Sequence, residues 1–411
     1  MNTVFVLIGL LLLSYLGSLL MSRRPGGGAG LPSGVEYAAL GFVLGPQLLD
    51  LVSARDLTAF EPVVQVAIGW LAFGVGLDFG VAEDRRVRPG SLALGALGTL
   101  ITGAAVTAAT WWSLRNLPTD LTATGRLLLS GGIGAACSQT TRYAVRQVAD
   151  HRRIRDRPLS SRLDEIAHSD ALVPLVAVAA LFAVDSPHIV TLSMPVCQWP
   201  AITICVAILL AGGAALLLRS DMVMEDTWGI LFGVALLTIG VAACAGVSTL
   251  AASFFMGLAL SSFSRHRNAL RALVAPTERP VLLPALLLAG ARLDFRATAA
   301  LPWIAAAAIG ARVAAKIAVG WVLAAGLSPL RKGGPLAGLS FTSCGALGMC
   351  VGLAFALRFP GVIGDTVLAV TVLAAIVGEI VGPAQLRRVL LAAGELDDAT
   401  ARTPRPRRVT V

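Results

Sequence analysis

Residues 167–174 read Ala167-His168-Ser169-Asp170-Ala171-Leu172-Val173-Pro174, and they open an apolar run that continues to Val184. A charge inside a membrane-length segment costs roughly 3 kcal/mol or more at mid-bilayer, so its default interpretation is a site on an ion or proton path. Pro174 has no N–H, which leaves the carbonyl group of Asp170 without its helical partner. A carboxylate beside a free carbonyl oxygen suits a small cation or a proton. The alternative is a side chain that reaches the interface from a helix end.

Composition indicates a membrane protein. Of the 411 residues, 56% are hydrophobic and only 14% are charged, and a soluble protein of this length cannot bury so much apolar surface. The net charge of +9 does not indicate nucleic-acid binding, because the arginines fall in short loops between apolar runs. The six cysteines lack the paired spacing of a metal site or a disulfide framework. We therefore expect an all-α polytopic membrane protein that binds no cofactor and no nucleic acid.

Thirteen segments are long enough to span a bilayer, which takes about 17–25 residues. They cover residues 2–21, 34–52, 62–80, 92–114, 122–148, 163–184, 196–218, 226–244, 247–263, 280–294, 298–327, 336–358 and 362–390. With the N-terminus outside, most Lys and Arg residues fall on the inner side together with the C-terminus. This predicts an integral protein of the bacterial inner membrane with a cytoplasmic C-terminus.

Two short stretches suggest an internal repeat. The third span ends with Gly74-Val75-Gly76-Leu77-Asp78-Phe79, and the tenth ends with Gly290-Ala291-Arg292-Leu293-Asp294-Phe295. Seven spans separate these copies, so they would lie on opposite sides of the membrane, as in inverted-repeat transporters. Spans one to six would then pair with spans eight to thirteen, and the seventh would connect the two halves.

The fifth and twelfth spans correspond in this repeat, and both are rich in glycine and hydroxyl residues. Such runs can unwind where they line a cavity. The predicted interruptions involve Gly134, Gln139 and Thr141 in the fifth span, and Ser343 and Gly345 in the twelfth. The alternative is close helix packing through small residues.

Basic residues within the predicted spans are candidates for a functional role. Lys316 is one of only two lysines among the 33 basic residues, and a buried lysine can release its proton whereas arginine does not. Lys316 is therefore a plausible charge partner for Asp170. Arg312 lies one turn earlier and Arg142 lies in the fifth span, and location at a helix end would explain Arg312 and Lys316 equally well.

Several motifs in the expected order resemble the monovalent cation:proton antiporter family, in particular the Kef and NapA-like branch of sodium/proton exchangers. The similar stretches are Leu31 to Pro46, the Gly-Leu-Asp-Phe end of the third span, Ser138-Gln139-Thr140, Ser169-Asp170 with Pro174, and Lys316. The resemblance covers about residues 3–391.

The resemblance implies a NapA/NhaA-like fold with two crossing broken helices and an elevator-type exchange of Na⁺ or K⁺ for H⁺. A moving core would comprise residues 92–184 and 298–390, a dimerising scaffold residues 1–80 and 226–294, and a connector residues 196–218. Asp170 would hold a proton or a cation in turn, with oxygens from Ser138, Thr140 and Ser169. The expected assembly is a homodimer in the lipid bilayer. Residues 392–411 would form a disordered cytoplasmic tail, without a nucleotide-binding regulatory domain in cis.

The sequence also departs from the family pattern. Relatives carry Asp, Asn or Gln before the key aspartate, whereas this chain has Ser169, so a single carboxylate favours electroneutral exchange. Without that preceding acid, Lys316 has no obvious partner except Asp170. The twelfth span lacks the Arg-Gly-Glu of many relatives, and Glu379 in the last span either compensates or belongs to a helix end near Pro383.

Other function classes stay open at this point. An organic-anion symporter on a related inverted-repeat fold would use Arg142 and Arg312 to bind its substrate, and a non-transporting sensor or a channel is a third possibility. An enzyme is not expected, because no nucleophile–base pair, metal motif or phosphate-binding loop occurs. His168 is a candidate modulator of pH response.

Overall fold

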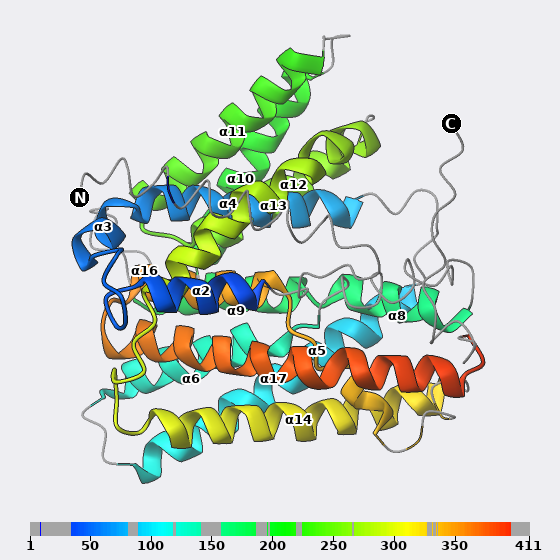
Figure 1. The fold of residues 1–411 in the computed structure, drawn as a ribbon. Coiled ribbons are helices and arrows are strands. Elements are labelled where there is room, and N and C mark those ends of the chain that lie inside the picture. The colour runs from blue at the N-terminus through cyan, green and yellow to red at the C-terminus, as the bar shows by residue number, and fades with distance from the viewer. Residues whose placement is uncertain are drawn as a thin grey trace, which may run out of the picture.

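The computed structural model describes residues 34–80, 89–117, 121–140, 158–185, 198–218, 224–264, 267–326 and 336–395, together with positions 9, 195, 331 and 334. Within these residues the secondary structure is helical and contains no strand. Many of the helices lie side by side with similar axes, while α10 and α11 extend away from the rest (Figure 1). The predicted all-α membrane architecture is confirmed.

One group of helices packs around α4 and α12. Its members are α2 (Val35–Leu44), α3 (Ala54–Ala59), α4 (Glu61–Gly80), α10 (Gln198–Leu217), α11 (Met224–Ala245), α12 (Thr249–Phe263) and α13 (Arg267–Ala291). Glycines allow two of its helix pairs to approach closely. Gly41 of α2 and Gly290 of α13 each face the backbone of the other helix, and Gly76 and Gly257 do the same across α4 and α12. Contact through small residues is the usual way in which membrane helices pack tightly.

A second group packs around α5 and α17. Its members are α5 (Pro89–Asn116), α6 (Ala123–Ser138), α8 (Pro158–Ser169), α9 (Leu172–Val184), α14 (Leu301–Gly326), the 3₁₀ helix η1 (Ala337–Phe341), α16 (Ala346–Arg358) and α17 (Val362–Ala392). Contacts between the two groups are fewer and involve mainly α9, α16 and α17.

Seven helices in the described ranges are long and apolar enough to cross a membrane, and an eighth span results if the bent halves of α13 count as one. The apolar helices α2, α12 and α16 are shorter, and α8 and α9 together form one of the seven spans. Most of the predicted span at residues 2–21 and most of the predicted tail at residues 392–411 lie outside the described residues. The number of thirteen spans therefore stays a prediction.

Two predicted boundaries were wrong. The span expected at residues 280–294 is helix α13, which begins thirteen residues earlier, at Arg267. Charged residues hide this part of the helix from a search for apolar runs, and Arg271 binds both Asp78 and Glu278 there. The helix expected over residues 34–52 ends at Leu44, because Gly45 adopts an extended conformation.

Prolines explain the shape of α13. Pro276, Pro280 and Pro284 lie inside it, and each removes one helical hydrogen bond. The segments Arg267–Glu278 and Pro280–Ala291 meet at an angle of 41°. The bend therefore has a local cause in the sequence.

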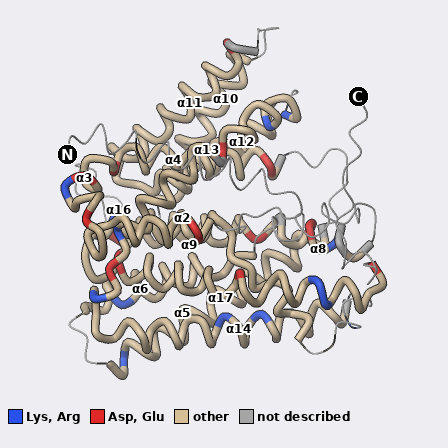
Figure 2. The backbone as a smooth tube through the Cα atoms, in the orientation of Figure 1, with Lys and Arg blue, Asp and Glu red and all other residues tan. Residues whose placement is uncertain are grey.

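Charged residues lie mostly near the helix ends, whereas α14 carries basic residues partway along its length (Figure 2). The basic residues of α14 are Arg312 and Lys316, and each is 2% exposed. Both lie in the second group of helices, so the fold places two buried cations beside the interrupted helices.

Candidate functional site

Asp170 lies at a break in the sixth predicted span. Helix α8 ends at Ser169 and α9 begins at Leu172, with a turn between them. Pro174 lies in the first turn of α9 and has no N–H to offer to the carbonyl group of Asp170. The carboxylate is buried, with 4% of the residue exposed. The local sequence thus produces the break that places this charge inside the protein.

A small cavity lies beside Asp170. Its polar lining comes from Asp170, Thr99, Thr140 and Lys316, and its other lining residues are apolar. The apolar lining residues are Leu94, Gly95, Gly98, Ile166, Val319, Leu323 and Phe341. The free volume is about 10 Å³, which is roughly the space that one water molecule needs. A cation that enters a cavity of this volume would have to lose most of its hydration shell and bind oxygen atoms of the protein instead.

The hydroxyl group of Thr140 connects the two charged residues of this cavity. The Lys316 ammonium group donates a hydrogen bond of 2.8 Å to Thr140 Oγ1, and Thr140 Oγ1 donates one of 3.0 Å to the carbonyl oxygen of Phe341. Thr140 also faces the Asp170 carboxylate. Asp170 and Lys316 line the same cavity and interact electrostatically. The lysine, which had no obvious partner other than Asp170 in the sequence, is bound to a hydroxyl group.

Thr99 was not among the residues expected at the site. This residue of α5 is 1% exposed, and its hydroxyl group faces Asp170 while donating to Gly95 O at 3.0 Å. Gly95 has no side chain, and a Cβ there would collide with the backbone of Ile166, so α5 lies directly against α8. The only signal in the sequence is a hydroxyl residue among glycines in an otherwise apolar span.

Two serines that we expected near the carboxylate lie outside the cavity. Ser138 Oγ donates to Ala135 O at 2.9 Å, and Ser169 Oγ donates to Ile166 O at 2.9 Å. Both hydroxyl groups therefore bond to their own helices. Ser169 packs against α5 at Gly95.

The interruptions in the fifth and twelfth spans meet each other. Helix α6 ends at Ser138 and is followed by extended backbone at Gln139, and residues 342–345 separate η1 from α16. Gln139 Nε2 donates to Gly345 O at 3.3 Å, so the two breaks are in direct contact. Gly134 lies inside α6, where it allows close approach to α5, and Thr141 lies outside the described residues.

Arg312 stabilises one side of this crossing. Its guanidinium group donates to Gln139 O at 3.1 Å and to Ala374 O at 3.4 Å. The carbonyl groups at the end of a helix carry a partial negative charge and lack helical partners. A buried cation therefore compensates the interrupted end of α6.

Glu379 lies on the other side of the crossing. Ser343 Oγ donates to Glu379 Oε1 at 3.0 Å, and the residue is 6% exposed. Gly378 and Gly382 flank it on α17, and a Cβ at either position would collide with the backbone of residues 342–343. The acid therefore lies close to the start of α16, where a helix carries partial positive charge. The placement of the His168 side chain lies outside what the structure describes, as does Arg142.

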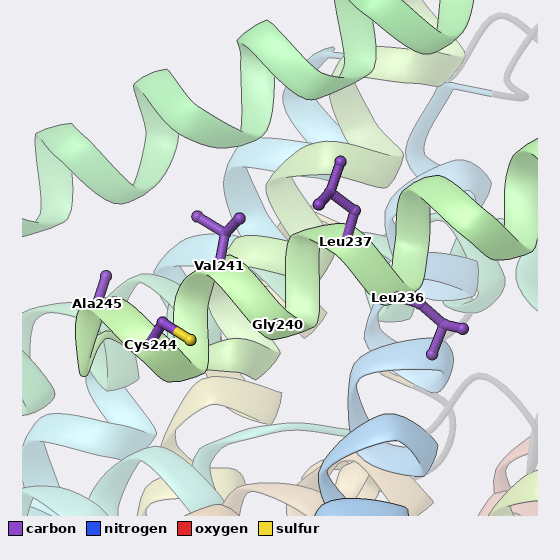
Figure 3. Close-up of a pocket in the computed structure, with 6 residues that line it drawn as sticks. All are labelled: Leu236, Leu237, Gly240, Val241, Cys244 and Ala245. Carbon is purple, nitrogen blue, oxygen red and sulfur yellow. The ribbon is translucent and has the colours of Figure 1, made fainter.

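A second, much larger pocket has an almost entirely apolar lining. It has a volume of about 800 Å³ and runs along α11, where its lining residues are Leu236, Leu237, Gly240, Val241, Cys244 and Ala245 (Figure 3). These side chains offer no oxygen ligand, so this pocket does not suit a cation. Among the described residues, no group of three His, Cys, Asp or Glu side chains could hold a metal ion.

The chain is similar to known proteins in both sequence and fold. The family model described as "Sodium/hydrogen exchanger, transmembrane" matches residues 8–392. The fold is similar to that of the sodium proton antiporter MjNhaP1 from Methanocaldococcus jannaschii at pH 8, with a TM-score of 0.70. The two sequences are 15% identical, and the alignment covers 95% of this chain and 99% of that chain. None of the curated protein sequences matches the chain.

At 15% identity the structural likeness shows the fold alone, whereas the family match extends over nearly the whole chain. Members of this family are transporters and not enzymes. The buried carboxylate, the two meeting helix breaks and the family match lead to one conclusion: this chain is an integral membrane protein of the sodium/hydrogen exchanger family, a cation/proton antiporter.

Proposed function

We propose that the chain exchanges one Na⁺ or K⁺ for one H⁺, and that both ions use the carboxylate of Asp170 in turn. The observation that carries this proposal is the cavity beside Asp170, which is small enough for about one guest. Burial of a carboxylate favours its protonated form, whereas a nearby cation favours the charged form. Competition for one carboxylate then couples the two fluxes without a second switch.

The proposed ligands of a dehydrated cation are oxygen atoms around Asp170. Thr140 and Thr99 present hydroxyl groups to the same cavity, and Lys316 is the charge partner of Asp170. Ser138 and Ser169 would have to rotate away from their own helices to contribute. With one carboxylate neutralised by one proton or one cation, the exchange is electroneutral.

The proposed cycle is an elevator movement of a core against a scaffold. The core comprises residues 92–184 and 298–390, the scaffold residues 1–80 and 226–294, and the connector residues 196–218. The separate packing of two helix groups supports this division. We further propose that the protein forms a homodimer through the scaffold in the bacterial inner membrane, with its N-terminus outside and its C-terminus in the cytoplasm.

Purified protein in proteoliposomes tests the site. Addition of Na⁺ or K⁺ should dissipate an imposed pH gradient, followed with a pH-sensitive dye, without any organic solute. The Asp170→Asn variant should abolish this exchange, because an amide neither binds nor releases the proton. Asp226→Asn is the matched control, since Asp226 is exposed at the start of α11 and should not affect exchange. Full exchange by Asp170→Asn would remove this residue from the mechanism.

A further inference from the structure

Helix α17 ends in a turn at residues 393–395. Gly394 has a φ of 75°, in the left-handed region that glycine adopts at little cost. The N–H of Gly394 donates to Leu391 O and that of Glu395 donates to Leu390 O, both at 3.0 Å. This pair of bonds is the usual glycine-based ending of a helix. It turns Glu395 back towards the bundle, and only 6% of the residue is exposed.

Glu395 binds the first turn of α8. The backbone N–H of Leu159 donates a hydrogen bond of 2.7 Å to Glu395 Oε1, across 236 positions of sequence. The first N–H groups of a helix have no partner inside it, and that end carries partial positive charge. A carboxylate satisfies both requirements, so this contact joins the start of α8 to the end of α17.

An apolar layer surrounds the contact and extends to the exchange site. Leu159, Leu163 and Ile166 of α8 belong to one buried cluster, together with Leu386, Val389 and Leu390 of α17. Positions 159, 163, 166 and 170 recur at the spacing of one helix face. Asp170 follows α8 directly, at roughly 16 Å along the helix axis from Leu159. Ile166 and Asp170 both line the small cavity.

We propose that Glu395 is a positioning residue for cation exchange, which fixes the first turn of α8 on the end of α17 and thereby sets the position of Asp170. The inference rests on the proposed function of Asp170. Helix α17 also packs on η1, whose Phe341 binds Thr140. We call the hydrogen bond between Glu395 and Leu159 the clamp. Through α17, the clamp fixes two sides of the cavity relative to each other, the α8 side with Asp170 and the η1 side with Thr140.

The test compares Glu395→Ala with Glu395→Gln in the full-length chain, with Asp226→Asn as the control. Hydrogen exchange of the peptide that covers residues 158–166 reports the clamp, and the half-saturating Na⁺ concentration in proteoliposomes reports the position of Asp170. Loss of one charged hydrogen bond should accelerate amide exchange in this turn by roughly tenfold and raise the half-saturating concentration by about three- to tenfold. Glu395→Gln keeps an oxygen acceptor but loses the charge, so both values should lie between those of Glu395→Ala and those of the unaltered protein.

Each outcome distinguishes the possible roles of Glu395. Unchanged amide exchange in Glu395→Ala would show that the clamp does not exist. Faster amide exchange with an unchanged half-saturating concentration would show a purely structural contact and would overturn the positioning role. If Glu395→Ala does not accumulate, Glu395→Asp replaces it, since the shorter side chain keeps the charge but withdraws the acceptor.

If the unaltered protein shows no cation-dependent exchange, the proposed function and the positioning role fail together. Loss of exchange in Asp170→Asn combined with normal affinity in Glu395→Ala would overturn the positioning role alone.

Discussion

At the scale of single residues, Thr140 determines how the buried charges are arranged. Its hydroxyl group accepts a hydrogen bond from Lys316 and donates one to Phe341 O, and it faces the Asp170 carboxylate. A hydroxyl group has one proton and two lone pairs, so one lone pair stays available for an incoming cation. The same atom can therefore hold the lysine and contribute to the ion site.

Replacement of Thr140 should show whether its hydroxyl group, and not only its volume, is needed for exchange. Thr140→Val removes the acceptor of a buried ammonium group, and leaving a buried donor unsatisfied costs about 1–3 kcal/mol or more. We expect the initial rate of Na⁺/H⁺ exchange to fall by about tenfold or more, whereas Thr140→Ser should keep most of it. Thr371→Val is the control, because Thr371 Oγ1 bonds to Val367 O in its own helix. Normal exchange by Thr140→Val would show that the Lys316 contact is dispensable.

Two threonines of α5 offer a matched pair. Thr99 lines the cavity beside Asp170, whereas Thr102 is equally buried and does not line it. Each hydroxyl group also bonds to a glycine carbonyl of its own helix. We expect Thr99→Val to raise the half-saturating Na⁺ concentration by about threefold or more, since one candidate ligand is lost, and Thr102→Val to leave it unchanged. Equal effects of the two variants would argue against Thr99 as a ligand.

At the scale of secondary structure elements, the interrupted spans are held by their neighbours. Arg312 donates to the carbonyl group that follows the end of α6, and Glu379 accepts from Ser343 just before α16. Each charge has the sign that opposes the partial charge of the nearby helix end. Unpaired backbone groups at membrane depth are costly, and Arg312 satisfies one of them, the carbonyl group of Gln139.

The packing of α17 on the twelfth-span break gives a prediction about stability. A Cβ at Gly378 would collide with Thr342 O, so Gly378→Ala should destabilise the folded protein by about 1–3 kcal/mol through overpacking. Gly233→Ala is the control, because nothing lies within 4 Å of a Cβ there, and alanine favours a helix by up to about 1 kcal/mol. Thermal unfolding of the two purified variants in the same detergent measures the difference. A melting temperature of Gly378→Ala equal to that of Gly233→Ala would contradict the close contact.

At the scale of the whole molecule, two helix pairs are packed in the same manner. Gly41 and Gly290 join α2 to α13, and Gly76 and Gly257 join α4 to α12. In the predicted repeat, the second span corresponds to the ninth and the third to the tenth, so each pair would map onto the other. The inverted repeat itself stays a prediction, and this reciprocal packing is the arrangement that such a repeat would produce.

Electroneutral exchange predicts that membrane potential has no effect on the balance of the ion gradients. Movement of one net charge across 100 mV corresponds to about 2.3 kcal/mol, or about fiftyfold in a concentration ratio. The membrane potential is clamped with a lipophilic ion at two values that differ by about 100 mV. We expect the pH gradient that stops net Na⁺ movement to be the same at both values. A shift that follows the potential would show that more than one proton moves per cation.

Much of this protein follows from local properties of its sequence. The lengths of apolar runs predicted a helical membrane protein, the missing N–H of Pro174 predicted a carbonyl group without its helical partner at Asp170, and glycine- and hydroxyl-rich runs predicted the breaks near Gln139 and Gly345. The sequence did not predict that the sixth span would divide into α8 and α9. Local patterns failed for α13, because Arg271 and Glu278 interrupt the apolar run while the helix continues, and the second partner of Arg271, Asp78, lies in α4.

The tertiary structure alone decided which residues meet at the site. Thr99 faces Asp170 only because Gly95 lets α5 lie against α8, and Lys316 binds Thr140 only because α14 packs beside the break. Glu395 reaches the start of α8 from the far end of the chain. Helix formation depends on neighbours within a few positions, and a sequence displays these directly. Contacts between distant residues depend on how whole helices pack, and no short pattern encodes that packing.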